Sequence, residues 1–115
     1  MIIRPAKKDD FKDHPVLSNV TLRAYVAEDQ GSIVGYAGYL YEENILQGFS
    51  WKGDIKPLSV IRLAKKTIEL FKKAHAPIYS IPSIEHEGSR KFLDYLGFVE
   101  LDNNIFVWDQ ANGRD

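Results

Sequence analysis

The spacing of apolar residues changes in the middle of the chain, and this change limits the folds that the sequence can adopt. From Val20 to Glu28 apolar residues alternate with others, which is the two-residue period of a strand with one buried face. From Pro57 to Lys73 apolar residues such as Ile61 and Ala64 recur at helical spacing. The proline that opens this segment suits the first turn of a helix. The sequence therefore predicts β-structure followed by a long amphipathic helix.

Turn and cap residues divide the rest of the chain into short segments. Asp29–Ser32 and Asp102–Asn104 have side chains typical of hairpin turns, Pro15 bars a long helix near the amino terminus, and Gly97 suits the end of a helix. We expect strands at Met1–Arg4, Val20–Glu28, Ile33–Tyr41, Ile45–Trp51, Ile78–Ile81, Phe98–Leu101 and Ile105–Trp108. We expect a short helical or irregular segment at Lys7–Leu17 and helices at Pro57–Lys73 and Glu85–Leu96.

The size of the chain allows one compact core. It has 115 residues, of which 44% are hydrophobic, so we expect a single domain over residues 1–108 and a polar tail over residues 109–115. The net charge of -1 offers no overall attraction to nucleic acid or to an anionic membrane. We see no apolar run of membrane-spanning length and no signal peptide, so a cytoplasmic location is the default expectation.

The residue types present exclude several kinds of chemistry. There is no Cys, which rules out disulfides, thiolate metal sites and a Cys nucleophile, and fits a reducing compartment. The three His residues lack metal-ligand spacing, so no metal site is expected. Neither a nucleophile-elbow motif nor a phosphate-binding loop of the Walker type is present.

Three segments and the order of elements together point to a known architecture. The segments are Ile2–Asp10, Asp29–Gly35 and Gly88–Phe98, the last of which ends in Leu-Gly-Phe. Over nearly the whole chain they resemble the GCN5-related N-acetyltransferase (GNAT) superfamily. The resemblance implies an α/β (α+β) fold, a mixed twisted sheet of about six or seven strands with a helix on each face. It also implies that the fourth and fifth strands are parallel and splayed apart.

The resemblance also implies an activity and a site. Members transfer an acyl group from acetyl-coenzyme A (acetyl-CoA) to an amine, which attacks the thioester directly; the acceptor here is unidentified. The positions that match the coenzyme site are Phe49, Ser50 and Trp51 for the pantetheine arm and Lys56, Ser59 and Arg62 for the phosphates. The candidate catalytic residues are Glu43, near where the family often places a water-activating carboxylate, and His86, in a slot that usually holds Asn.

Two slots of the family pattern hold other residues. Leu93 stands where a Tyr usually protonates the departing thiolate, and residues 52–59 contain one Gly in place of a Gly-x-Gly turn. A second hypothesis is therefore a non-catalytic binding or assembly module with a protein partner. The chain also resembles acetyltransferase-like proteins of tailed bacteriophages, some of which are associated with the virion.

Two further groups of residues allow two interpretations each. The basic group Lys56, Arg62, Lys65, Lys66, Lys72 and Lys73 either binds a phosphate or forms a solvated helix face. The aromatic group Tyr36, Tyr39, Tyr41, Phe49 and Trp51 either lines a pocket or packs as core and cross-strand pairs.

Overall fold

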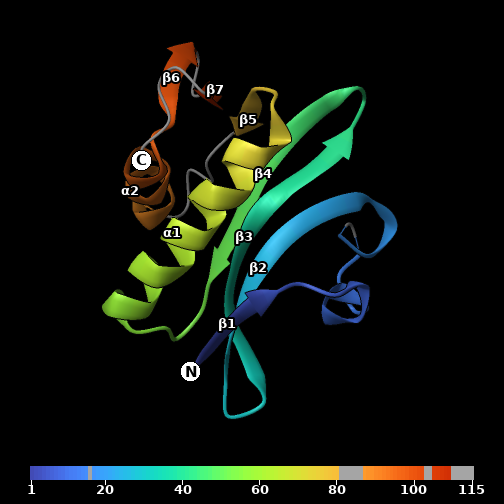
Figure 1. Ribbon diagram of the computed structural model, residues 1–115, viewed down its shortest axis with the longest axis vertical. Helices are drawn as coiled ribbons and strands as arrows, with labels where there is room; N and C mark the ends of the chain where they lie inside the picture. Colours follow the sequence, from blue (N-terminus) through green and yellow to red (C-terminus); the bar gives the residue numbers. More distant parts are fainter. Residues whose placement is uncertain (16, 81–86, 103–104, 110–115) are drawn as a thin grey trace.

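The computed structural model describes residues 1–15, 17–80, 87–102 and 105–109, and within them seven strands form one mixed sheet (Figure 1). The strands are β1 (Ile2–Pro5), β2 (Thr21–Asp29), β3 (Ser32–Glu42), β4 (Ile45–Lys52), β5 (Ile78–Ser80), β6 (Val99–Asp102) and β7 (Ile105–Trp108). The helices are α1 (Pro57–Ala74) and α2 (Glu87–Leu96), with short 3-10 segments η1 (Lys8–Phe11) and η2 (Leu17–Asn19). The strand order is β1-β2-β3-β4-β5-β7-β6.

The mixed sheet that the sequence predicts is confirmed. All neighbouring strands are antiparallel except β4 and β5, which are parallel as expected. The turns between β2 and β3 and between β3 and β4 each have two successive residues with positive φ, at Gln30–Gly31 and Glu43–Asn44. This is the hairpin turn whose twist matches that of the flanking strands. The expected residues Ile81, Glu85 and His86 lie outside the described residues, as do residues 110–115 of the expected tail.

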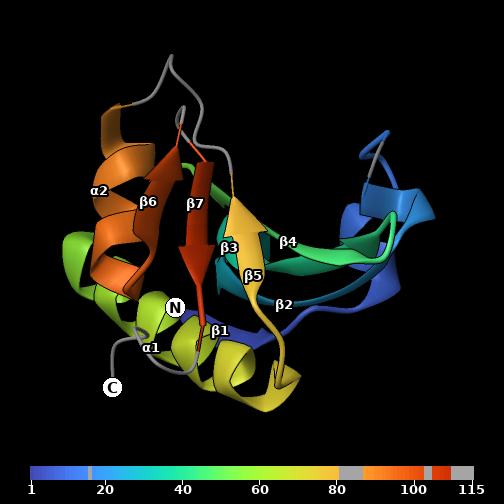
Figure 2. The same cartoon turned by 90° about the horizontal axis from the view of Figure 1, so that it is seen from above.

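The prediction that the two long helices lie on opposite faces of the sheet is wrong. Residues of α1 and α2 belong to one buried cluster, and Figure 2 shows both helices away from the amino-terminal η1 and η2. The reason is the handedness of the connections. The crossovers β4-α1-β5 and β5-α2-β6 step in the same direction along the sheet, and right-handed crossovers in one direction place their helices on one face.

Each face of the sheet has its own core. The helix side buries residues of α1, α2 and three strands, and Trp108 donates its indole N–H to the Leu96 carbonyl oxygen at 2.9 Å. The members of this core are Tyr39, Ala64, Ile68, Phe71, Ile78, Leu93, Leu96, Phe98, Phe106 and Trp108. The opposite face is covered by η1 and η2, and its buried members are Phe11, Leu17, Ala24, Val26 and Leu40.

An ion cluster joins η1 to the edge strand β1 and its neighbour β2. The Arg4 guanidinium donates two hydrogen bonds to the Asp10 carboxylate, at 2.8 and 2.9 Å, and two to Glu28, at 2.9 and 3.1 Å. Asp10 also accepts the backbone N–H of Lys7. The hydrogen bonds from Arg4 hold the pKa of Asp10 below its ordinary value of 3.8, because they favour the charged carboxylate.

The stability of the fold should therefore depend on the charge of Asp10. Because the folded pKa is lowered, the carboxylate contributes stability above pH 3.8, and this contribution is lost as the pH falls through the folded value. Asp10→Asn should lower the free energy of unfolding at pH 7 by about 1 to 3 kcal/mol. In the variant, this free energy should also decrease less as the pH is lowered than it does in the parent protein. Urea denaturation at several pH values measures both effects. Asp13→Asn, at an exposed acid of the same segment, should do neither. Equal losses in both variants would contradict this role.

Gly38 lies close against the backbone of the neighbouring strand β2. A Cβ atom at this position would overlap the backbone of Arg23 and Ala24 on β2, with 2.5 Å to the Ala24 Cα. Gly38→Ala should therefore destabilise the fold by about 1 to 3 kcal/mol or more, because the strand backbones cannot move apart without breaking their pairing. Gly35→Ala is the matched control on the same strand, since its Cβ would meet neighbours at an ordinary 3.4 Å. Thermal melts that rank the two variants the other way would contradict this prediction.

Candidate functional site

Among the described residues, the parallel pairing between β4 and β5 is short, and it covers only the first part of β4. In the part of the chain that the structure describes, the two strands pair only at Leu46 with Ile78 and at Gln47 with Tyr79. Ser80 then donates its hydroxyl to the Gly48 carbonyl oxygen at 3.5 Å. Beyond this point β4 continues to Lys52 with no described partner on that side. We call residues 48–52 the open edge of β4.

The open edge offers main-chain hydrogen-bonding groups. The Gly48 carbonyl points toward β5, so by the two-residue period of a strand the N–H and C=O of Ser50 point to the same side. Strand edges of this kind bind extended ligands that carry amide groups. All three expected pantetheine residues, Phe49, Ser50 and Trp51, lie on this part of β4.

The loop between β4 and α1 uses several of its own amides. Gly53 donates its N–H to the Val34 carbonyl oxygen at 2.8 Å, and Ile55 donates to Gly53 at 3.0 Å. The Ser59 N–H donates to the Lys56 carbonyl oxygen at 3.0 Å, and Pro57 has no N–H. The side chain of Ile55 is buried and approaches Gly35. The loop is therefore tied to the sheet, and few amides are left to hold a pyrophosphate.

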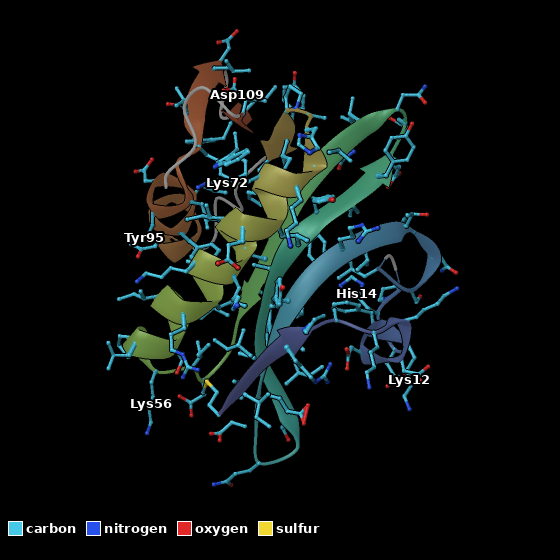
Figure 3. The ribbon with its side chains drawn as sticks, in the orientation of Figure 1. Lys12, His14, Lys56, Lys72, Tyr95 and Asp109 are labelled. Atoms are coloured by element: carbon cyan, nitrogen blue, oxygen red, sulfur yellow. The ribbon has the colours of Figure 1, made fainter. Side chains whose placement is uncertain are left out.

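The expected phosphate residues lie at the start of α1, but they do not share one surface. Lys56 and Arg62 are exposed, and Figure 3 shows the Lys56 side chain pointing away from the sheet at the end of the helix. The Ser59 side chain is buried at 8% exposure, on the face of α1 that packs toward the sheet. Two of the three side chains are therefore accessible to an anion.

The aromatic residues divide between the two faces of the sheet. Phe11, Tyr36 and Phe49 contact one another, and Trp51 stacks on Tyr36 with 5.6 Å between ring centroids. Burial raises the pKa of the Tyr36 hydroxyl, which keeps it protonated at neutral pH. Trp51 remains 47% exposed and lies over Gly53, where any side chain would meet its ring. These contacts hold an exposed aromatic surface in one orientation.

The other two aromatic residues of the expected group take no part in this surface. Tyr39 is buried on the helix side, where it packs against Phe71. Tyr41 is exposed and donates its hydroxyl to Asn44 at 3.1 Å, within the turn between β3 and β4. The interpretation as core and cross-strand packing therefore applies to Tyr39 and to the Tyr36–Trp51 pair, and the pocket interpretation stays a prediction.

Of the two candidate catalytic residues, Glu43 lies within the described residues. Glu43 lies in the exposed turn at the start of β4, at the opposite end of that strand from the loop that leads to α1 (Figure 1). At about 3.3 Å per residue it is at most roughly 17 Å along the chain from Gly48, where the open edge begins. His86 lies outside the described residues.

Leu93 occupies a core position, at the end of α2. Its carbonyl oxygen accepts the N–H groups of Gly97 and Phe98 at 3.1 and 3.0 Å, and Gly97 has φ of 101°. This is a helix cap with a left-handed glycine, in which the side chains at its two ends usually contact each other. Here those ends are Leu93 and Phe98, which belong to the same core. The slot therefore supplies packing and no transferable proton.

Ser80 is a residue that the sequence interpretation missed. The expected strand at Ile78–Ile81 includes its backbone position. That strand did not indicate that its hydroxyl lies where β4 and β5 separate. The signal was present, because polar residues at the carboxyl end of a parallel strand often face a ligand.

Comparison with known proteins identifies the fold. No family model and no curated protein matches the sequence. Two solved structures match over nearly their whole length. The smu.2055 protein of Streptococcus mutans UA159 has a TM-score of 0.63 and 15% identity, and the match covers 95% of this chain and 99% of that one. An N-acetyltransferase of Staphylococcus aureus Mu50 has a TM-score of 0.62 and 15% identity, and the match covers 94% of this chain and 97% of that one. A candidate GnaT-family acetyltransferase of Bordetella pertussis also matches (0.54, 13%, 87% and 68%). The chain has a GNAT-like fold. Within the described residues, no helix is long and apolar enough to span a membrane.

The burial of Leu93 generates a prediction about the missing hydroxyl. Leu93→Tyr should lower the free energy of unfolding by about 1 to 3 kcal/mol through overpacking, and it should confer no acetyl transfer. Lys73→Tyr, at an exposed position of α1, is the control and should stay within about 0.5 kcal/mol of the parent protein. Urea denaturation measures both. A gain of transfer without loss of stability would show that position 93 faces a working cleft.

Proposed function

We propose that the chain is an N-acyltransferase that takes an acyl group from a pantetheine thioester, such as acetyl-CoA, and transfers it to an amine. The observation that carries the proposal is the open edge of β4 beside a parallel strand. A pantetheine arm contains two amide groups, which can pair with a strand edge as an added strand does. The GNAT-like fold supports the proposal at the level of architecture.

The reaction needs no covalent intermediate on the protein. The amine nitrogen forms a bond to the thioester carbonyl carbon, the carbon–sulfur bond breaks, and the proton lost by the amine ends on the thiol. The protein contributes by holding the thioester next to the amine, which replaces a bimolecular encounter. Main-chain N–H groups at the open edge are suited to stabilise the negative charge that develops on the carbonyl oxygen.

Proton transfer is proposed for residues near the point where β4 and β5 part. Ser80 carries a described hydroxyl at that point, and its role would be to exchange its hydrogen bond to the Gly48 carbonyl oxygen for one to the departing sulfur. His86 remains a proposed proton donor, on the basis of its slot in the sequence pattern. We assign no role to Glu43 in this scheme, because it lies at the other end of β4.

Binding of the coenzyme phosphates is expected to be weak. Lys56 and Arg62 are the accessible cations at the start of α1, and Leu58 has an N–H without an intrahelical partner. Against them, the amides of Gly53 and Ile55 already donate to main-chain carbonyls.

A second candidate function is a non-catalytic binding or assembly module that keeps the fold, including one that binds a virion protein. The burial of Leu93 in the core favours it, because the position that would supply the proton in the family supplies packing here. In that case no acyl-pantetheine compound would bind.

Titration calorimetry with acetyl-CoA and with acetyl-pantetheine tests the proposal. Both should bind, acetyl-CoA in the upper micromolar range. Lys56→Ala and Arg62→Ala should each weaken acetyl-CoA by about 1.5 to 3 kcal/mol, which is tenfold or more, and leave acetyl-pantetheine unchanged. Lys12→Ala is the control, since Figure 3 shows Lys12 on the opposite side of the molecule from Lys56. Absence of binding by both compounds at millimolar concentration would contradict the proposal and support the module.

A further inference from the structure

We infer that the outer face of the first half of α1 docks an acidic carrier protein, which presents the acyl group on its pantetheine arm in place of acetyl-CoA. This inference rests on the function proposed above and names the source of its thioester. Pantetheine thioesters occur on coenzyme A and on carrier proteins, and the two sources differ in what surrounds the arm. Coenzyme A adds a nucleotide with a pyrophosphate, whereas a carrier protein adds an acidic protein surface.

The charge of α1 is the first observation. From Lys56 to Ala74 there are six basic residues and one acidic residue, a net charge of +5, so the rest of the chain carries -6 to give the total of -1. The basic charge is thus concentrated on one helix of an otherwise acidic protein. Such a separation of charge attracts an acidic partner to this helix and repels it elsewhere.

The arrangement of exposed side chains is the second observation. Leu58 and Ile61 are 76% and 38% exposed, and Arg62 and Lys65 are exposed beside them. Their spacing of i, i+3, i+4 and i+7 places them on one face of the helix, over about 10 Å of its length. We call these four residues the docking face. Both cations are exposed, and neither forms an ion pair within the described residues.

The combination of groups favours a protein partner. A nucleotide phosphate would not bind the two aliphatic side chains. Exposed aliphatic residues flanked by cations are typical contacts for an amphipathic acidic helix. A nucleic acid would in addition meet the net charge of -6 on the rest of the chain. An acidic protein helix satisfies both the apolar and the charged members of the docking face.

The position of the docking face relates it to the open edge. The loop of residues 53–56 connects the end of β4 to the start of α1, so the two features adjoin in the chain and lie in the same part of the molecule (Figure 1). The amides of that loop that would hold a pyrophosphate are largely committed to main-chain carbonyls. A carrier protein needs none of them, because its own docking supplies the affinity. The acyl group passes to the amine as before, and the carrier leaves with a free thiol.

Binding measurements with four probes test the inference. The probes are a bacterial acyl carrier protein with an acetylated pantetheine arm, the same protein without the arm, acetyl-CoA and acetyl-pantetheine. We expect the acetylated carrier to bind at least tenfold more tightly than acetyl-CoA and than the carrier without the arm. Its affinity should fall with rising salt, because the contact depends on charge.

Charge reversal locates the contact. Arg62→Glu with Lys65→Glu should weaken the acetylated carrier at least tenfold and leave acetyl-pantetheine unchanged. Lys8→Glu with Lys12→Glu makes the same change of charge on η1 and its cap and should have no such effect. Arg62→Ala with Lys65→Ala gives a milder version if the reversal disturbs folding, and circular dichroism checks both.

Each alternative result has a separate meaning. Binding of acetyl-CoA at least as tight as that of the carrier would overturn the inference and leave the proposed function intact. Failure of all acyl-pantetheine probes would overturn both. A carrier affinity unchanged by the reversal would remove α1 as the docking face, and tighter binding of an RNA oligonucleotide would identify a different class of partner.

Discussion

The handedness of two successive crossovers governs how this small protein is built. Because both β4-α1-β5 and β5-α2-β6 advance in one direction along the sheet, α1 and α2 share a face and a core. The opposite face is then left to short 3-10 segments, which bury only a few side chains such as Phe11. α2 packs beside α1 on this face, and the outer side of α1 carries exposed residues such as Leu58 and Arg62.

The loop before α1 combines two requirements that oppose each other. Its hydrogen bonds to β3 and within itself fix the point at which the helix begins, and the buried Ile55 adds to this attachment. The same bonds use the amides that an anion would need. The main-chain groups at the open edge of β4 take no part in these bonds. The bonds within the loop therefore limit the proposed phosphate contacts and leave the proposed strand-edge contacts unaffected.

The sequence predicted the strands and helices well, because their periods of two and of 3.6 residues are local properties. It failed on the faces of the helices, since these depend on the order of strands across the sheet, and β6 and β7 exchange places in that order. The exposure of Arg62 followed from helical periodicity. The buried Ser59 and the bond from Gly53 to Val34 did not, because a partner nineteen positions away leaves no mark on local composition.

The contrast between the two tryptophans gives the molecule separate optical reporters. Trp108 is fully buried in the helix-side core, whereas Trp51 is half exposed on the open edge of β4, with its ring lying over Gly53 and against Tyr36. Indole emission shifts with the polarity of its surroundings, so Trp108 reports the integrity of the core and Trp51 reports events at the strand edge. A soluble quencher reaches the second and is excluded from the first. Fluorescence can therefore follow ligand binding and unfolding in one sample of unlabelled protein.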